Sequence, residues 1–328
     1  MSEALPAHGK GRPIDSDELE RQLAHVRRSA AGDIAGVFGP GSMIWQIDRE
    51  AAVFLGAGRA LLLQLAHPWV AAGVAEHSTT LSDPIGRFHR TFEIMFTLVF
   101  GSLDQALAAA RRLHRRHAAV RGDLAAAQVP SARGTYSANE AAALQWVHAT
   151  LVETALIAHD VVLPPLSGAD RERYYQESRL LGAMFGLAPE VQPASWTAFA
   201  AYNEAMRGSD VLCVGPTARN IATQVLGGAG GWLRAPRWYR AVTAHLLPPS
   251  VRDGFELPYG PHERRTAERA LRGLRRIYPA LPGKLRQVGP YQEAMERLRG
   301  RSPPGAAVRL LNRAWIGRPT LPGPRAEG

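Results

Sequence analysis

The sequence predicts an all-α fold built as a single large domain. Hydrophobic residues make up 46% of the 328 residues but aromatic residues only 7%, which is typical of helices rich in alanine and leucine. Long runs of alternating β-branched residues, which would indicate a sheet, do not occur in the sequence. Capping residues and prolines divide the chain into segments of helical length. We expect a disordered leader over residues 1–13, the helical domain over 14–318 and a flexible tail over 319–328.

The first helices are predicted from their caps. Asp15 or Ser16 can cap a helix with the sequence DELERQLAHVRR, whose acidic start and basic end match the helix dipole. An apolar helix is expected over residues 51–66. His67 and Pro68 must end or kink it, because a residue before proline is pushed out of helical geometry.

The same reasoning places the later helices. An Asp-Pro pair at 83–84 starts a helix that runs to about residue 100, and Ser102 caps the next one, which carries RRLHRRH. The sequence SANE at 137–140 has the pattern of a capping box and opens a helix to about residue 160. Further helices are expected at 167–186, 189–207, 217–226, 236–247, 261–278 and 289–315.

Charge and cysteine content limit the cellular setting. The formal net charge of +10 comes almost entirely from arginine, a skew typical of a high-GC bacterium, so it is weak evidence for a nucleic-acid partner. The single cysteine, Cys213, excludes a disulfide framework within one chain and suits a reducing compartment. The first thirty residues contain no apolar signal region. We therefore expect a cytoplasmic protein.

A membrane-spanning segment is not expected. The most apolar stretch, residues 51–75, is interrupted by Arg59, Gln64, His67 and Pro68, so it falls short of the roughly 20 uninterrupted apolar residues that a span requires. Peripheral contact with a membrane remains compatible with the sequence.

Several catalytic patterns are missing from the sequence. It has no Gly-x-Ser-x-Gly, no phosphate-binding loop and neither an HExxH nor an ExxH pair. The last absence argues against a carboxylate-bridged di-iron bundle, the main helical alternative for oxygen chemistry. Cys213 lacks the surroundings of a thiolate haem ligand and is interpreted as a small buried hydrophobe.

The histidines are distributed unevenly along the chain. Seven of the eleven lie between His67 and His159, in segments predicted to be helical. His114 and His117 stand at i and i+3 and therefore share one helical face. A single histidine on an apolar helix is more often a satisfied core residue than a ligand, and HRRH alone is typical of a basic surface.

A cationic edge is predicted on the preceding helix, where Arg87, Arg90 and Thr91 stand at i, i+3 and i+4. Alone, this edge is typical of a surface. Together with the histidines it is more informative, because buried guanidinium and imidazole groups without partners are costly. One shared, anionic ligand that contains iron would supply both partners, propionates for arginine and the metal for one imidazole.

Four segments taken in order resemble the MpaB-type oxygenase family, to which latex clearing proteins (rubber oxygenases) are more distantly related. They are QLAHPWVAAGVAEHS, DPIGRFHRTFEIMFTLVFG, RRLHRRHAAVRG and LQWVHATLVETAL, and the resemblance covers about residues 35–280. It implies an all-helical protein that binds one haem b through a single histidine. It also implies the use of dioxygen on a hydrophobic, often isoprenoid, substrate.

The resemblance assigns roles to individual residues. In latex clearing proteins the iron ligand is the second histidine of an HxxH element that follows an RxxKT element. The corresponding elements here are Arg87–Thr91 and His114–His117, so His117 inherits the role of metal ligand. Arg87 and Thr91 are the implied catalytic residues on the oxygen-binding side.

Other residues are expected to surround the cofactor. His114, His148, His67 and Arg90 complete the implied haem-binding set with His117 and Arg87. Arg90 replaces the lysine of RxxKT, and its pKa above about 12 prevents it from becoming a neutral iron ligand. This departure, with the missing export signal, argues against rubber as the substrate. The side chains expected to shape the substrate pocket are apolar: Leu62, Leu65, Phe92 and Phe96.

The function implied is a haem-b-dependent oxygenase that uses O2 to cleave or hydroxylate a hydrophobic substrate, with an unidentified electron donor if one is needed. One alternative is a non-catalytic carrier of haem or of a hydrophobic ligand, with His67, His77 or His148 as second axial ligand. The other is an interaction protein that uses the basic region 252–301 on nucleic acid or anionic lipid. Pairs such as Glu268 and Arg272 in that region are typical of a solvated helix, so we expect no nucleic-acid partner.

Overall fold

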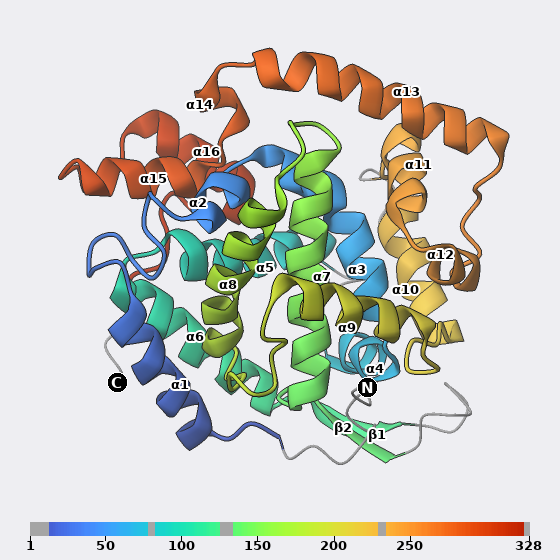
Figure 1. Ribbon diagram of the computed structural model, residues 1–328, viewed down its shortest axis with the longest axis horizontal. Coiled ribbons are helices and arrows are strands. Elements are labelled where there is room, and N and C mark those ends of the chain that lie inside the picture. The colour runs from blue at the N-terminus through green and yellow to red at the C-terminus, as the bar shows by residue number, and fades with distance from the viewer. Residues whose placement is uncertain (1–12, 78–82, 125–133, 229–233, 325–328) are drawn as a thin grey trace.

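Helices account for most of the chain. The computed structural model describes residues 13–77, 83–124, 134–228 and 234–324. Within these ranges the strands are two short ones, which form one antiparallel hairpin at the edge of the helical body (Figure 1). The all-α fold class predicted from the sequence is confirmed.

The elements follow one another in this order. The N-terminal half contains α1 (Ser16–Ser29), α2 (Met43–Asp48), the 3-10 helix η1 (Ala51–Gly56), α3 (Ala57–Leu65), α4 (Pro68–His77), α5 (Pro84–Phe100), α6 (Leu103–Ala118), β1 (Arg121–Leu124), β2 (Gly134–Ser137) and α7 (Ala141–Asp160). The C-terminal half contains α8 (Gly168–Met184), α9 (Trp196–Gly208), α10 (Pro216–Gly227), α11 (Arg237–Leu246), α12 (Pro249–Gly254), α13 (Pro261–Ile277), the 3-10 helix η2 (Tyr278–Ala280), α14 (Gly283–Arg286), α15 (Gly289–Leu298) and α16 (Ala306–Ile316).

Most of the predicted caps are confirmed. The Asp15 carboxylate accepts a hydrogen bond from the Glu18 amide at 2.9 Å and starts α1. Asp83 caps α5 in the same way. Ser102 caps α6 within a complete capping box. The apolar segment also ends where the sequence predicted, because α3 stops at Leu65 and Pro68 begins α4.

Three predicted boundaries are wrong. The helix expected from the SANE pattern is capped by Glu140, whose carboxylate accepts from the Ala143 amide, while Ser137 ends strand β2. The helix expected from residue 189 begins only at α9, where Ser195 supplies the cap. The segment 289–315 is divided into α15 and α16, because Gly300 adopts a φ of +76° and two prolines follow it.

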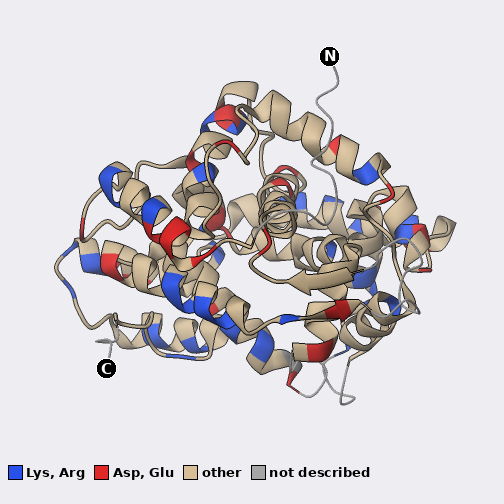
Figure 2. Cartoon of the chain, turned by 90° about the horizontal axis from the view of Figure 1, so that it is seen from below, with Lys and Arg blue, Asp and Glu red and all other residues tan. Residues whose placement is uncertain are grey.

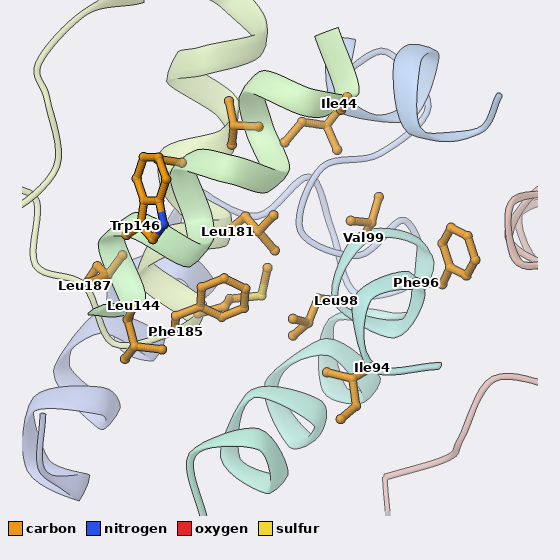
Figure 3. Close-up of a cluster of buried hydrophobic side chains, with 14 of the residues drawn as sticks. Ile44, Ile94, Phe96, Leu98, Val99, Leu144, Trp146, Leu181, Phe185 and Leu187 are labelled. Carbon is orange, nitrogen blue, oxygen red and sulfur yellow. The ribbon is translucent and has the colours of Figure 1, made fainter. Parts of the chain in front are cut away.

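Helix α7 runs through the middle of the molecule (Figure 1). By length and composition alone this helix could cross a membrane. However, 67% of its most apolar 18-residue stretch is buried inside the protein, as expected for a central core helix. Figure 3 shows Leu144 and Trp146 of α7 facing the same apolar cluster as Leu98 of α5 and Leu181 of α8. Trp146 is 1% exposed, and its indole N–H donates to the Leu63 carbonyl at 2.9 Å.

Helices α3, α7 and α11 meet in a tightly packed junction. A Cβ atom on Gly58 of α3 would lie 2.5 Å from the Thr243 hydroxyl of α11, so only glycine allows this approach. Arg59, which is 2% exposed, donates to Glu153 and Thr154 of α7 at 2.6 Å each. Its Nε donates to the Leu246 carbonyl at the end of α11 at 2.9 Å. The Arg59 guanidinium therefore joins three helices.

The sequence predicted a disordered leader at 1–13 and a flexible tail at 319–328. Residues 1–12 of the predicted leader lie outside the described residues. Within the segment predicted as a tail, Leu321 is 3% exposed and its amide donates to Glu293 at 3.0 Å. The packing of the domain therefore extends at least to Leu321.

Figure 2 shows acidic and basic residues interspersed along the helices. Several arginines pair with nearby acids, such as Arg111 with Glu20 at 2.7 Å and Arg173 with Glu177 at 3.2 Å. This mixing is typical of a solvated surface rather than of a continuous nucleic-acid face.

Candidate functional site

A cavity of about 270 Å³ lies between α3, α4, α7, the β-hairpin and the ends of α5 and α6 that face it. Its volume is near the lower end of the roughly 300–1,000 Å³ usual for small-molecule pockets. The wall is mainly apolar, with residues such as Leu65, Val70 and Val147, and the polar side chains are few. We call it the His117 cavity, because His117 and Arg87 both line it.

His117 lies in the last turn of α6. Burial, followed by the nearby charges of His114 and Arg116, lowers the pKa of its imidazole to about 4. The ring is therefore neutral near pH 7. It makes no hydrogen bond with any residue that the structure describes, so both ring nitrogens remain available to a ligand.

Arg87 reaches the same cavity from the first turns of α5. Its side chain is half-buried, and burial lowers the pKa of the guanidinium from its ordinary value, with a smaller contribution from Arg90. The guanidinium still carries its charge at neutral pH. The cavity therefore pairs one neutral imidazole with one fixed cation.

A hydrogen-bonded group of three side chains forms another part of the wall. The Tyr136 hydroxyl of β2 donates to Glu76 of α4 at 2.5 Å, and the His77 Nε2 lies 3.1 Å from the same hydroxyl. Burial, and then Glu76, raises the pKa of Tyr136, so its hydroxyl stays protonated. Tyr136 and His77 both line the cavity.

Two of the histidines expected near the cofactor point elsewhere. His148 is fully buried, and its Nε2 lies 2.9 Å from the Ser178 carbonyl of α8. The residues of α7 that line the cavity include Val147, which is offset from His148 around the helix. His114 is 8% exposed and lies outside the lining, one turn before His117. Its backbone carbonyl accepts from Asn139 at 3.2 Å and thereby ties α6 to the start of α7.

The other residues predicted to bind the cofactor or act in catalysis, Arg90, Thr91 and His67, also lie outside the lining of this cavity. Arg90 forms an exposed ion pair with Asp83 at 3.0 Å, and Thr91 is exposed. His67 is 8% exposed and stands edge-on to Trp69, with ring centroids 6.1 Å apart. Of the predicted set, the structure thus brings Arg87 and His117 together at one cavity.

Comparison with known proteins agrees with this arrangement of motifs. The family model described as "ER-bound oxygenase mpaB/B'/Rubber oxygenase, catalytic domain" matches residues 44–279, which is more than half of the chain. The chain belongs to this family. Neither a curated protein nor a solved structure matches the chain. As an MpaB/rubber oxygenase catalytic domain, it uses dioxygen on a small-molecule substrate.

The matched range includes every element that lines the His117 cavity. The metal-binding side chains of this MpaB/rubber oxygenase domain indicate which kind of metal site it can form. In the described part of this chain, no cluster of three or more His, Cys, Asp or Glu residues could hold a metal by itself. The neutral imidazole of His117 beside a guanidinium instead fits an iron whose remaining ligands come from a macrocycle with carboxylate groups.

Sequence reasoning missed Tyr136 as a cavity residue and Glu76 as the acceptor of its hydroxyl. They come from segments that are remote in sequence, β2 and α4. Tyr136 lies outside the four family-like segments, and Glu76 lies within the first of them without an implied role. The hairpin that carries Tyr136 was itself not predicted. The only available signal was the histidine at position 77, which sequence analysis considered as an axial ligand.

Proposed function

We propose that this protein is a haem-b-dependent oxygenase in which His117 is the iron ligand and the substrate is a hydrophobic small molecule. The observation that supports the proposal is a neutral imidazole without a hydrogen-bond partner among the described residues, facing a mainly apolar cavity that also contains Arg87. A protein of the reducing cytoplasm is consistent with the lone Cys213, and we include that location in the proposal.

The residues of the chain have distinct tasks in this proposal. His117 would hold the iron, and Arg87 would donate to a propionate or supply a positive charge on the oxygen-binding side of the cavity. Bound haem supplies the activation of dioxygen, which protein side chains cannot provide. The apolar wall around Leu65 and Val147 excludes water and accommodates a hydrophobic substrate.

Tyr136 has a further part in the proposal as a positioning residue at the wall of the cavity. Its hydroxyl is held between Glu76 and His77 at the wall of the cavity. Because its pKa is raised, the hydroxyl keeps its proton at neutral pH and donates it to Glu76, so the phenol ring is held in a fixed position beside the cavity. Thr91 and Arg90, which the family resemblance implied, are exposed and do not line the cavity.

An absorption spectrum with a pyridine haemochrome assay tests the cofactor directly. We expect a Soret band for the purified protein supplied with haem, and its loss or a large change in position in His117→Ala. His25→Ala is the matched control, because His25 is exposed on α1 and far from the cavity residues in sequence; it should keep the wild-type spectrum. A wild-type protein without haem, or a normal spectrum in His117→Ala, would overturn the proposal.

A second measurement separates an oxygenase from a carrier. Oxygen consumption is followed with squalene, an apolar isoprenoid, in the presence and absence of a chemical reductant. An oxygenase consumes O2 in step with product formation, and Tyr136→Phe should slow the reaction while retaining the Soret band. A haem spectrum without O2 consumption across several apolar substrates would favour the carrier.

A further inference from the structure

A second and larger pocket, of about 500 Å³, lies between α10, α11, the segment after α12 and the start of α13. It shares no lining residue with the His117 cavity. Its apolar part is formed by residues such as Leu226, Ala244 and Phe255, which are nearly buried. We call it the arginine pocket, because three arginines also line it.

Arg234 precedes α11, and Arg237 and Arg240 lie on it at i and i+3, so the last two share a face of the helix. Ala241 and Ala244 continue that face into the apolar part of the pocket. None of the three guanidinium groups makes an ion pair or a side-chain hydrogen bond to the residues described here. The Nε atom of Arg240 is buried and has no hydrogen-bond partner among the residues that the structure describes.

The acidic residues in the wall do not neutralise these arginines. Glu256 lies 3.3 Å from Arg219. Glu263 accepts from the Gly260 amide at 2.9 Å and closes the capping box of α13. Both carboxylates are therefore engaged by groups other than the three arginines.

The start of α11 adds a second source of positive potential. Pro236 stands at the N-cap, no side chain in the described ranges caps this end, and the first turn contains no acidic residue. The amides of residues 237–239 have no acceptor within the helix, and the helix dipole places positive potential at this end. An uncapped helix N-terminus beside arginines is a suitable site for an anion.

We propose that the arginine pocket binds an amphipathic anion, in which a carboxylate or phosphate group meets Arg237, Arg240 and the start of α11. An apolar chain attached to that group lies against Leu226, Ala244 and Phe255. A free inorganic anion would leave the apolar surface uncovered, and a neutral lipid would gain nothing from the guanidinium charges and would leave the buried Nε of Arg240 unsatisfied. The proposal does not depend on haem, because the two pockets have separate walls.

Calorimetric titration of the haem-free and haem-loaded protein tests this site with four probes: octanoate, octyl phosphate, octanol and inorganic phosphate. We expect octanoate or octyl phosphate to bind at least tenfold more tightly than octanol or inorganic phosphate, a difference of about 1.4 kcal/mol. The stronger of the two amphiphiles identifies the headgroup. Equal binding of octanol, or no binding by either amphiphile, would overturn the proposal.

Variants test which residues bind the headgroup. Arg237→Gln combined with Arg240→Gln should weaken binding of the amphiphile at least tenfold. Arg237→Gln combined with Arg240→Lys keeps one of the two charges and should bind more tightly than that double variant. The charge-matched control is Arg265→Gln combined with Arg276→Gln, since these arginines are exposed on α13 and do not line the pocket. Equal weakening in the control would show that overall charge is responsible and would contradict the assignment. Circular dichroism establishes that each variant is folded.

Discussion

Helices α6 and α11 each supply charged or polar groups to one of the two pockets. They differ at their N-termini, because side chains cap the backbone amides of α6 but not those of α11. Helix α6 begins with a capping box formed by Ser102 and Gln105, and it offers a single neutral imidazole near its C-terminus. Helix α11 begins at Pro236 without a capping side chain and has arginines in its first turn. The comparison indicates that α6 is held by its own side chains, whereas α11 leaves its donors for an anion.

The two regions are connected through the Arg59 junction. Helices α3 and α7 line the His117 cavity, and α11 lines the arginine pocket. Arg59 binds α7 through Glu153 and Thr154, and it binds the end of α11 through the Leu246 carbonyl. Burial lowers the pKa of Arg59, and Glu153 opposes this by stabilising the charged form.

The largest predicted effect is the loss of this junction. Arg59→Met leaves the largely buried Glu153 with Arg207, 2.8 Å away, as its one remaining ion-pair partner among the described residues, and it removes three hydrogen bonds. Breaking a buried pair by removing one partner costs about 3–5 kcal/mol, and we expect a decrease of this size in the free energy of unfolding. Urea unfolding followed by circular dichroism measures it.

Two further variants sharpen the interpretation. Arg90→Met removes an exposed pair with Asp83 and should cost less than about 1 kcal/mol. Arg59→Met combined with Glu153→Leu should recover part of the loss, because it no longer leaves a carboxylate without its main partner. If Arg59→Met were as mild as Arg90→Met, Arg59 would not hold the two regions together.

The next largest effect is the pH dependence of stability that the buried His148 causes. Burial lowers the pKa of His148 to about 4, below its unfolded value of about 6.5. Between these two pH values the unfolded chain binds a proton that the folded protein does not. The free energy of unfolding therefore falls as the pH decreases from 6.5 to 4, by up to about 3 kcal/mol at 1.36 kcal/mol for each pKa unit.

His148→Gln isolates this contribution, because an amide nitrogen can still donate to the Ser178 carbonyl but does not titrate. The variant is needed because Asp48 acts in the opposite direction, since burial raises its pKa to about 7. The quantity to measure is the difference in stability between wild type and His148→Gln at pH 7 and pH 4.5. A difference independent of pH would contradict a neutral His148, and an altered Soret band would indicate that His148 contacts the haem.

Local patterns were enough to predict the scaffold but only part of the site. Asp15, Asp83 and Ser102 act on amides three residues away, so their role is visible in sequence. Arg87 and His117 were predicted through two ordered motifs, and the structure places both at one cavity. Phe92 and Phe96 were expected to line that pocket, but they pack with Phe54, at ring-centroid distances of 4.4 and 6.0 Å.

What could not be predicted depends on contacts between distant segments. Helical periodicity shows that His148 faces the core, but only the position of α8 shows that the Ser178 carbonyl receives its hydrogen bond. Arg234, Arg237 and Arg240 resemble the other arginines of a basic chain until α10 and α13 close a pocket around them. Sequence spacing identified candidate groups, while tertiary packing determined which of them meet.

The smallest predicted effect tests the comparison between the two helix starts. Ser102→Ala removes the hydroxyl that accepts from the Gln105 amide at 3.3 Å, and loss of such a cap costs about 1 kcal/mol. Ser29→Ala, at the exposed end of α1, is the matched control and should change stability by less than about 0.5 kcal/mol.

Pro236→Ser should instead stabilise α11 slightly and weaken binding of the amphipathic anion, because the new hydroxyl would compete for the same amides. Urea unfolding and calorimetry check both results, and an unchanged affinity in Pro236→Ser would show that the start of α11 does not contact the headgroup.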